Sequence, residues 1–118
     1  MSFELVHSTA TSFSHVTEEF PFDKTTLVYK VGGKMFLLID IESPNAITLK
    51  STPSKVDELI ESCAWITPGF HMNKSHWVTI HLSHPQTDFS LVTSLISESY
   101  CLVFSGLSNK VKNVLENR

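Results

Sequence analysis

Arginine is almost absent from this chain of 118 residues, in which the single arginine is Arg118. Because arginine is the usual bidentate reader of guanine, strong base-specific recognition of DNA is not expected. The formal net charge of −3 also argues against a strongly cationic nucleic-acid binder. A local basic surface is still compatible with that charge.

Long apolar runs are missing too. No run approaches the roughly 20 residues that a membrane helix needs. The first 15 residues, MSFELVHSTATSFSH, have neither the basic segment nor the long apolar segment of a signal peptide. With 42% hydrophobic and 18% charged residues, the chain suits one folded domain over residues 1–118. We therefore expect a cytoplasmic protein with no membrane partner, and we take it to be a monomer.

Motifs for catalysis and metal binding are also lacking. The chain has no CxxC, HExxH, GxSxG or P-loop sequence. Four histidines are close in sequence, namely His71, His76, His81 and His84. In a strand, however, His76 and His81 point to opposite faces, and no carboxylate stands at a ligand spacing. Cys63 and Cys101 fall on apolar stripes, which predicts two buried, inert thiols in a reducing compartment. We predict no enzymatic activity, no metal and no cofactor.

The apolar pattern predicts an α+β fold. The β-rich stretches on either side of Gly32-Gly33 indicate a hairpin, and Thr52, Asp88 and Ser108 are suited to begin helices. The expected elements are a helix at 3–13, strands at 25–31, 34–41, 46–50 and 76–82, and helices from 53, after 88 (through 100–104) and after 108. An antiparallel sheet, a meander plus a fourth strand, covered on one face by helices is the economical arrangement.

The turn at Gly32-Gly33 decides which side chains face outward. A two-residue loop mixes apolar and charged residues on both faces, whereas a three-residue loop over 32–34 pairs Val31 with Met35 and separates them. We predict the three-residue loop, with a glycine in the left-handed conformation. The outward face then carries Lys30, Lys34, Lys50, Phe36 and Trp77. Lysines interleaved with aromatics suit a nucleic-acid backbone and its bases. The alternative is a solvated face whose lysine stems cover two aromatics.

Residues 68–77, PGFHMNKSHW, are the densest set of hydrogen-bonding side chains in the chain. The candidate functional residues here are His71, Asn73, Lys74, His76 and Trp77. Such side chains can brace the backbone of a loop that follows Pro-Gly. Polar loops on rigid scaffolds also often carry function. The residues alone leave both interpretations open.

Several motifs together resemble one known family. FPFD (20–23), VYKVGGKMF (28–36), TLK (48–50), PGFHMNKSHW (68–77) and SY-LV (99–103) are similar in order and spacing to the MmcQ/YjbR family of small bacterial proteins, over roughly residues 18–107. The resemblance implies a CyaY-like (frataxin-like) fold and a DNA-binding protein with a double-wing motif. The matching positions are Phe20, Pro21, Phe22, Asp23, Lys30, Gly33, Lys34, Phe36, Lys50, Pro68, Gly69, His71, Asn73, Lys74, Trp77, Ser99 and Tyr100. An iron site of the frataxin type is not expected, because the first helix has only Glu4.

The leading hypothesis is weak, largely sequence-independent DNA binding. The predicted contact residues are Lys30, Lys34, Phe36, Lys50, His71, Asn73, Lys74, His76 and Trp77. One alternative is a protein-interaction module in which Phe36 and Trp77 form an anchor patch. Another is a protein that binds a small ligand in a concave pocket beside the 68–77 loop.

Overall fold

The fold is described by a computed structural model over residues 3–69 and 72–117. In chain order the elements are α1 (Phe3–Thr11), β1 (Val16–Glu19), β2 (Thr26–Val31), β3 (Lys34–Asp40), β4 (Ala46–Lys50), α2 (Pro53–Ser62), β5 (Ile66–Pro68), β6 (Trp77–His81), α3 (Phe89–Ser105) and α4 (Asn109–Glu116). The strands form one antiparallel sheet in the order β1-β2-β3-β4-β6-β5. The predicted α+β class with an antiparallel sheet is therefore confirmed.

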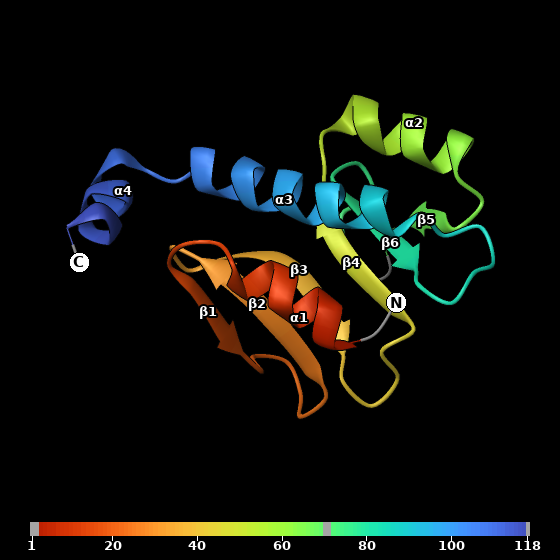
Figure 1. The fold of residues 1–118 in the computed structure, drawn as a ribbon. Helices are drawn as coiled ribbons and strands as arrows, with labels where there is room; N and C mark the ends of the chain where they lie inside the picture. Colours follow the sequence, from red (N-terminus) through yellow and green to blue (C-terminus); the bar gives the residue numbers. More distant parts are fainter. Residues whose placement is uncertain (1–2, 70–71, 118) are drawn as a thin grey trace.

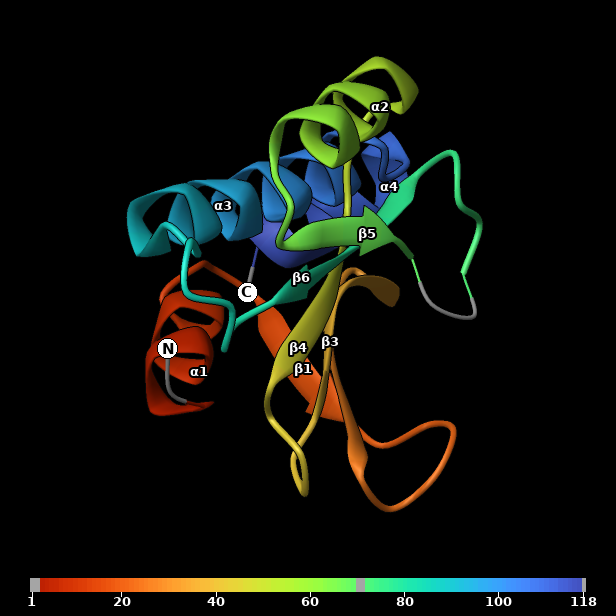
Figure 2. The ribbon, with the colours of Figure 1, turned by 90° about the vertical axis from the view of Figure 1, so that its right-hand side faces the viewer.

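Helices α1, α2 and α3 pack on one face of this sheet (Figure 1). Helix α3 crosses β2, β3 and β4, α1 packs beside α3, and α2 lies over β5 and β6. The apolar side chains of these helices and of the inward sheet face form one buried core. The loops at 20–25 and 72–76 project toward the other side of the sheet (Figure 2). That side has no helix over it among the described residues.

The predicted helix starts are confirmed. The side chains of Thr52, Asp88 and Ser108 accept hydrogen bonds from backbone N–H groups in the first turns of α2, α3 and α4. Such a cap typically contributes about 1 kcal/mol. Residues 100–104 lie within α3, as the 3.6-residue period predicts.

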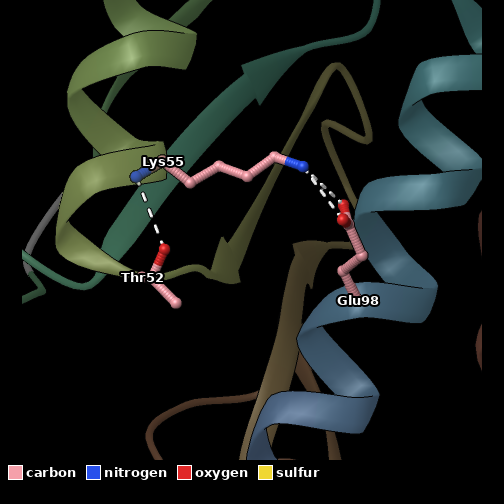
Figure 3. Close-up of polar contacts among 3 residues, drawn as sticks. All are labelled: Thr52, Lys55 and Glu98. Atoms are coloured by element: carbon pink, nitrogen blue, oxygen red, sulfur yellow. Dashed lines mark hydrogen bonds and ion pairs between the residues drawn. The ribbon is translucent and has the colours of Figure 1, made fainter.

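Helices α2 and α3 are also joined by an ion pair (Figure 3). The Nζ atom of Lys55 lies 2.9 Å from Oε1 and 3.2 Å from Oε2 of Glu98. Because both side chains are a third to a half exposed, the pair contributes at most about 1 kcal/mol. Packing of the apolar helix faces, rather than this pair, holds the helices in place.

The hairpin turn differs from the prediction. Val31 pairs with Lys34, so the loop is the two-residue Gly32-Gly33 turn and not the three-residue loop. Both glycines have positive φ, 58° and 81°, which the primed turns of tight hairpins require. A Cβ at residue 32 would also lie 2.6 Å from Leu107, so this turn packs closely against the corner between α3 and α4.

A β-bulge restores the predicted pairing beyond the turn. The register shifts by one residue between Tyr29 and Lys30, and Tyr29 then pairs with Leu37. This is the pairing that the three-residue loop would have produced for the body of the hairpin. The extra residue is Phe36, which the bulge turns into the core beside Tyr29. The sequence pattern therefore predicted the pairing of the hairpin body correctly, but it placed the cause in the turn and put Phe36 on the wrong face.

Ser99 on α3 completes the ladder where the bulge interrupts it. Its Oγ donates to the carbonyl oxygen of Phe36 at 2.6 Å and accepts from the backbone N–H of Lys50 at 2.9 Å. Pairing between β3 and β4 begins only at Leu37 and Leu49, so these two groups lie just beyond the ladder. Ser99 is completely buried. One hydroxyl thus satisfies two backbone groups and fixes α3 on the sheet.

Tyr100, the next residue, fixes the N-terminal segment. Its hydroxyl donates to the carbonyl oxygen of Ser14 at 2.6 Å, and its ring stacks on Phe13. Burial is the larger cause that raises the pKa of Tyr100, and the neighbouring Cys101 adds to it. The Ser99-Tyr100 pair of the motif at 99–103 is therefore explained by hydrogen bonding and packing within the fold.

Three features were not predicted. Strand β1 has one apolar residue in four, and β5 has three residues and ends in a proline, so neither shows the alternation of a strand. The first helix ends at Thr11 and not at Phe13. The prediction of two buried thiols is wrong, because Cys63 is half-buried and Cys101 is exposed on the outer side of α3.

No described helix is by itself long and apolar enough to cross a membrane, and α3 and α4 reach that length only together, across a 113° bend.

Candidate functional site

The loop at 68–77 is closed by a close approach of Gly69 to Trp77. The Gly69 N–H donates to the carbonyl oxygen of Trp77 at 2.9 Å. A Cβ at residue 69 would lie 2.6 Å from the Trp77 Cβ and 2.8 Å from its carbonyl oxygen, so only glycine fits. Pro68, which pairs with Val78, ends β5 immediately before it. The Pro-Gly pair of the motif is therefore explained by loop closure.

Asn73 braces the loop from inside. Its Oδ1 accepts a hydrogen bond from the backbone N–H of Ser75 at 2.9 Å. Its backbone carbonyl oxygen accepts a hydrogen bond from the backbone N–H of His76 at 3.1 Å. The carbonyl oxygen of His76 accepts from the N–H of Ser51 at 2.8 Å, which ties the loop to the end of β4. His71 lies outside the described residues. Both Asn73 and His76 thus have structural roles in the backbone of the loop.

Two aromatic residues do not lie where they were predicted. Phe36 is fully buried, with its ring edge-on to Tyr100 at 5.4 Å between centroids. Trp77 is only 8% exposed. The outward position predicted for Phe36 is wrong because the bulge directs it toward α3. Phe36 and Trp77 therefore do not form the exposed anchor patch on which the predicted protein-interaction module was based.

Lys30 is paired. Its Nζ lies 2.7 Å from Oε2 of Glu19 on the neighbouring strand β1, and its side chain is 19% exposed. The partner was not foreseen because β1 was not predicted. Lys30 therefore offers little free positive charge.

Three other lysines lie at the same end of the strands. Lys34 begins β3 at the hairpin turn, and Lys50 ends β4 opposite Trp77, where the loop that carries Lys74 joins β6. None of the three forms an ion pair with a carboxylate in residues 3–69 and 72–117. We call Lys34, Lys50 and Lys74 the lysine end.

A recess of about 300 Å³ connects two of these lysines to Trp77. Lys34 and Lys50 border it, and the remaining lining residues are Met35, Leu102, Val103 and Gly106. The recess thus lies between the end of the sheet and the C-terminal part of α3. Cations that border such a recess are suited to hold a phosphate group.

The opposite end of the strands is acidic. Asp23 precedes β2, Asp40 ends β3, and Glu42 follows it. The Oδ1 of Asp23 accepts from the N–H groups of Thr25 at 3.0 Å and Thr26 at 2.7 Å. The aspartate of the FPFD motif therefore shapes the start of β2, a role that an Asx turn explains.

We expect the pKa of Asp23 to lie below its ordinary value of 3.8. The backbone N–H of Thr26 is the largest cause and that of Thr25 the next, since both favour the carboxylate. A carboxyl group with a lowered pKa stabilises the folded state at pH values above its ordinary pKa. This stability is lost as the pH falls through the pKa of the folded state. NMR titration of the carboxyl carbon measures the shift, and a pKa at or above 3.8 would contradict it.

The side of the sheet without helices contains a larger cavity, of about 650 Å³. The strands supply its floor, and the loops at 20–25 and 72–76 supply Phe22 and Met72 as walls. Further lining residues include Asp23, Thr26, Leu38, Asp40, Thr48, Thr67, Pro68, Thr79 and His81. We call this the open-face cavity. It brings the FPFD motif and the Pro68 end of PGFHMNKSHW to one surface.

Three of the described histidines have side-chain partners within the fold. His81 Nε2 lies 3.0 Å from the Thr67 hydroxyl, and His84 Nδ1 accepts from the N–H of Gln86 at 3.0 Å. His7 Nδ1 lies 2.9 Å from the Tyr29 hydroxyl. Over the described parts of the chain, no three His, Cys, Asp or Glu side chains gather in a group suited to a metal ion.

Comparisons with known proteins point to one family. The family model described as YjbR matches residues 11–102. The uncharacterized protein YbdF of Escherichia coli O157:H7 is 35% identical over 91 residues, which are 76% of this chain and 74% of that protein. The uncharacterized protein YjbR of Escherichia coli K12 is 31% identical over 72 residues, 60% of each chain.

Solved structures agree with the fold. The crystal structure of protein DR2400 of Deinococcus radiodurans, with a domain described as DUF419, has a TM-score of 0.88 at 34% identity and covers 98% of this chain and 88% of its own. A protein from Pseudomonas syringae has a TM-score of 0.73 at 26% identity and covers 87% of this chain and 99% of its own.

Proposed function

The chain belongs to the YjbR family, and from that premise we propose that it binds DNA weakly and largely without sequence preference through the lysine end. The observation that carries the proposal is that Lys34 and Lys50 border the same recess beside Trp77, while Lys74 lies in the loop that leads into Trp77. None of the three has a carboxylate partner among the described residues. Lysines act as point charges toward phosphates.

Charge distribution supports this choice of surface. The net charge of −3 disfavours attraction of DNA to the molecule as a whole, so contact depends on a local surface. Asp23, Asp40 and Glu42 lie at the far end of the strands, away from the lysine end. The scarcity of arginine fits phosphate contact without base reading.

Two loops that leave the same end of the sheet suit the double-wing description. One is the Gly32-Gly33 turn, and the other joins β5 to β6 and carries Lys74. The proposal includes the CyaY-like (frataxin-like) fold assignment, which the order of a first helix, an antiparallel sheet and a later helix on one face supports. It also includes action as a monomer in the cytoplasm and assigns no catalytic step.

The test is fluorescence anisotropy with labelled single- and double-stranded DNA over a salt series. With about three phosphate contacts we expect log K to fall against log salt with a slope of about −2 to −3. The variant Lys34→Ala/Lys50→Ala should weaken binding and flatten the slope by about two units, because two phosphate contacts are lost.

The matched control is Lys24→Ala/Lys55→Ala, which changes the net charge equally at two lysines that do not line the Trp77 recess. We expect it to bind nearly as the parent does. Equal weakening by both double variants would mean that only net charge matters and that the lysine end is not the site. No binding at low salt by the folded parent would reject DNA as the ligand.

A further inference from the structure

The open-face cavity has the size and form of a small-molecule site. Its volume of about 650 Å³ lies within the range of about 300–1,000 Å³ common for such sites. Two loops flank it, with Phe22 on one side and Pro68 and Met72 on the other. Figure 2 shows both loops extending to the same side of the sheet. The sheet thus becomes the floor of a concave surface.

The floor of the cavity combines hydroxyls with apolar groups. The hydroxyls of Thr48 and Thr79 lie 3.2 Å apart, and Thr67 is bonded to His81 at 3.0 Å. Leu38 lies beside them. Such a floor can pack a flat ring and offers hydroxyl groups to polar atoms on it.

An exposed aromatic residue borders the cavity. Phe22 is 62% exposed, although a phenyl ring in a folded protein is usually covered. Met72, on the opposite wall, has a flexible and polarizable side chain that adapts to different ring shapes. A planar apolar group between these two side chains would cover both.

The charge of the lining is negative. Asp23 and Asp40 both line the cavity, whereas no lysine or arginine does. One oxygen of Asp40 accepts from the N–H of Glu42, and its other oxygen has no partner among the described residues. Hydrogen bonds from Thr26 and Thr25 lower the pKa of Asp23, which favours its ionised form. This lining favours a cation and disfavours an anion such as DNA.

We propose that the open-face cavity binds a small aromatic or heteroaromatic molecule that carries a positive charge, such as an aromatic amine or amidine. The ring lies on the Leu38 side of the floor against Phe22, and the cationic group is held by Asp40 and Asp23. This site is separate from the lysine end and does not depend on DNA binding.

Three probes of nearly equal shape separate the contribution of the positive charge to binding from that of the ring. Benzamidine is a cation, benzamide is neutral and benzoate is an anion. In an ¹⁵N-labelled sample we expect benzamidine to shift the backbone amide signals of Thr26, Leu38 and Thr48 in a saturable way. Benzamide should bind about tenfold more weakly, which corresponds to the loss of one ion pair in a partly shielded site. Benzoate should cause no saturable shift there.

Variants identify the residues that hold the probe. Asp40→Asn should weaken benzamidine about tenfold and leave benzamide unchanged, since only the cation uses that charge. Asp40 is exposed, and its bond to Glu42 can be kept by asparagine. Lys34→Ala, at the lysine end, should change neither probe, and loss of DNA binding in that variant would not affect this test.

Three outcomes would overturn the proposal. One is equal affinity for benzamidine and benzamide in the parent. Another is saturable shifts located away from the open-face cavity. The third is a concentration-dependent shift of the same amides without any probe, together with dimers in sedimentation experiments, because a second copy of the chain would then cover this face.

Discussion

Replacing Ser99 with alanine is expected to lower the free energy of unfolding by about 2–4 kcal/mol, because two buried backbone groups lose their partner and each costs about 1–3 kcal/mol. The carbonyl oxygen of Phe36 and the N–H of Lys50 would be left beneath α3 without a hydrogen-bond partner, because both lie just beyond the β3–β4 ladder. Urea unfolding followed by circular dichroism measures the change.

The control for this variant is Ser94→Ala on the exposed side of the same helix. It should change stability by no more than about 0.5 kcal/mol, with a small gain from the better helix propensity of alanine. If Ser99→Ala is as stable as Ser94→Ala, the hydroxyl of Ser99 is not what completes the sheet at the bulge.

The bulge shows which part of the hairpin could be predicted from the apolar sequence pattern alone. Apolar alternation along β2 and β3 required Tyr29 and Leu37 to share a face, and they do. Alternation cannot distinguish a longer turn from a tight turn followed by a bulge, because both shift the register by one residue. The bulge is accompanied by a hydrogen bond to Phe36 from Ser99, more than sixty residues away in sequence, and a local pattern cannot show such a contact.

Long and regular elements were predictable because their signals are local. A cap such as Thr52 and a run of apolar residues at helical spacing specify α2 without knowledge of the rest of the fold. Strand β1 has no such signal. Its residues are mostly exposed at the sheet edge, and it is a strand because it pairs with β2.

The candidate site was predicted in part. Lys34 and Lys50 were predicted from their spacing with aromatics on the strands, and Lys74 from the polar loop at 68–77. Their common position at one end of the sheet depends on the β4–β6 pairing, which the pattern does not reveal. Lys30 was placed in the same set because its partner Glu19 lies on the unrecognised strand. The open-face cavity was beyond the reach of pattern, since its walls come from loops about fifty residues apart.

The motifs shared with the family divide into two kinds. Gly69, Asn73 and Ser99 are used up by hydrogen bonds or close packing within the fold. Lys34 and Phe22, by contrast, are exposed, and no hydrogen bond or ion pair to residues 3–69 or 72–117 accounts for them. Functional tests are therefore best directed at the lysine end and the open-face cavity.

Replacing Gly69 with alanine is expected to cost about 2–3 kcal/mol of unfolding free energy, in the range of overpacking substitutions. The new Cβ would lie 2.8 Å from the carbonyl oxygen of Trp77, and backbone cannot move aside as a side-chain tip can. Gly106→Ala is the control, since its Cβ would meet nothing closer than 3.5 Å and its φ of −82° suits alanine. Thermal and urea unfolding compare the two variants, and equal stabilities would contradict the close packing of Gly69 on Trp77. DNA binding can also be measured under conditions in which Gly69→Ala is folded. Weaker binding by this variant would show that the contact of Gly69 with Trp77 positions Lys74 and the Trp77 recess, in addition to closing the loop.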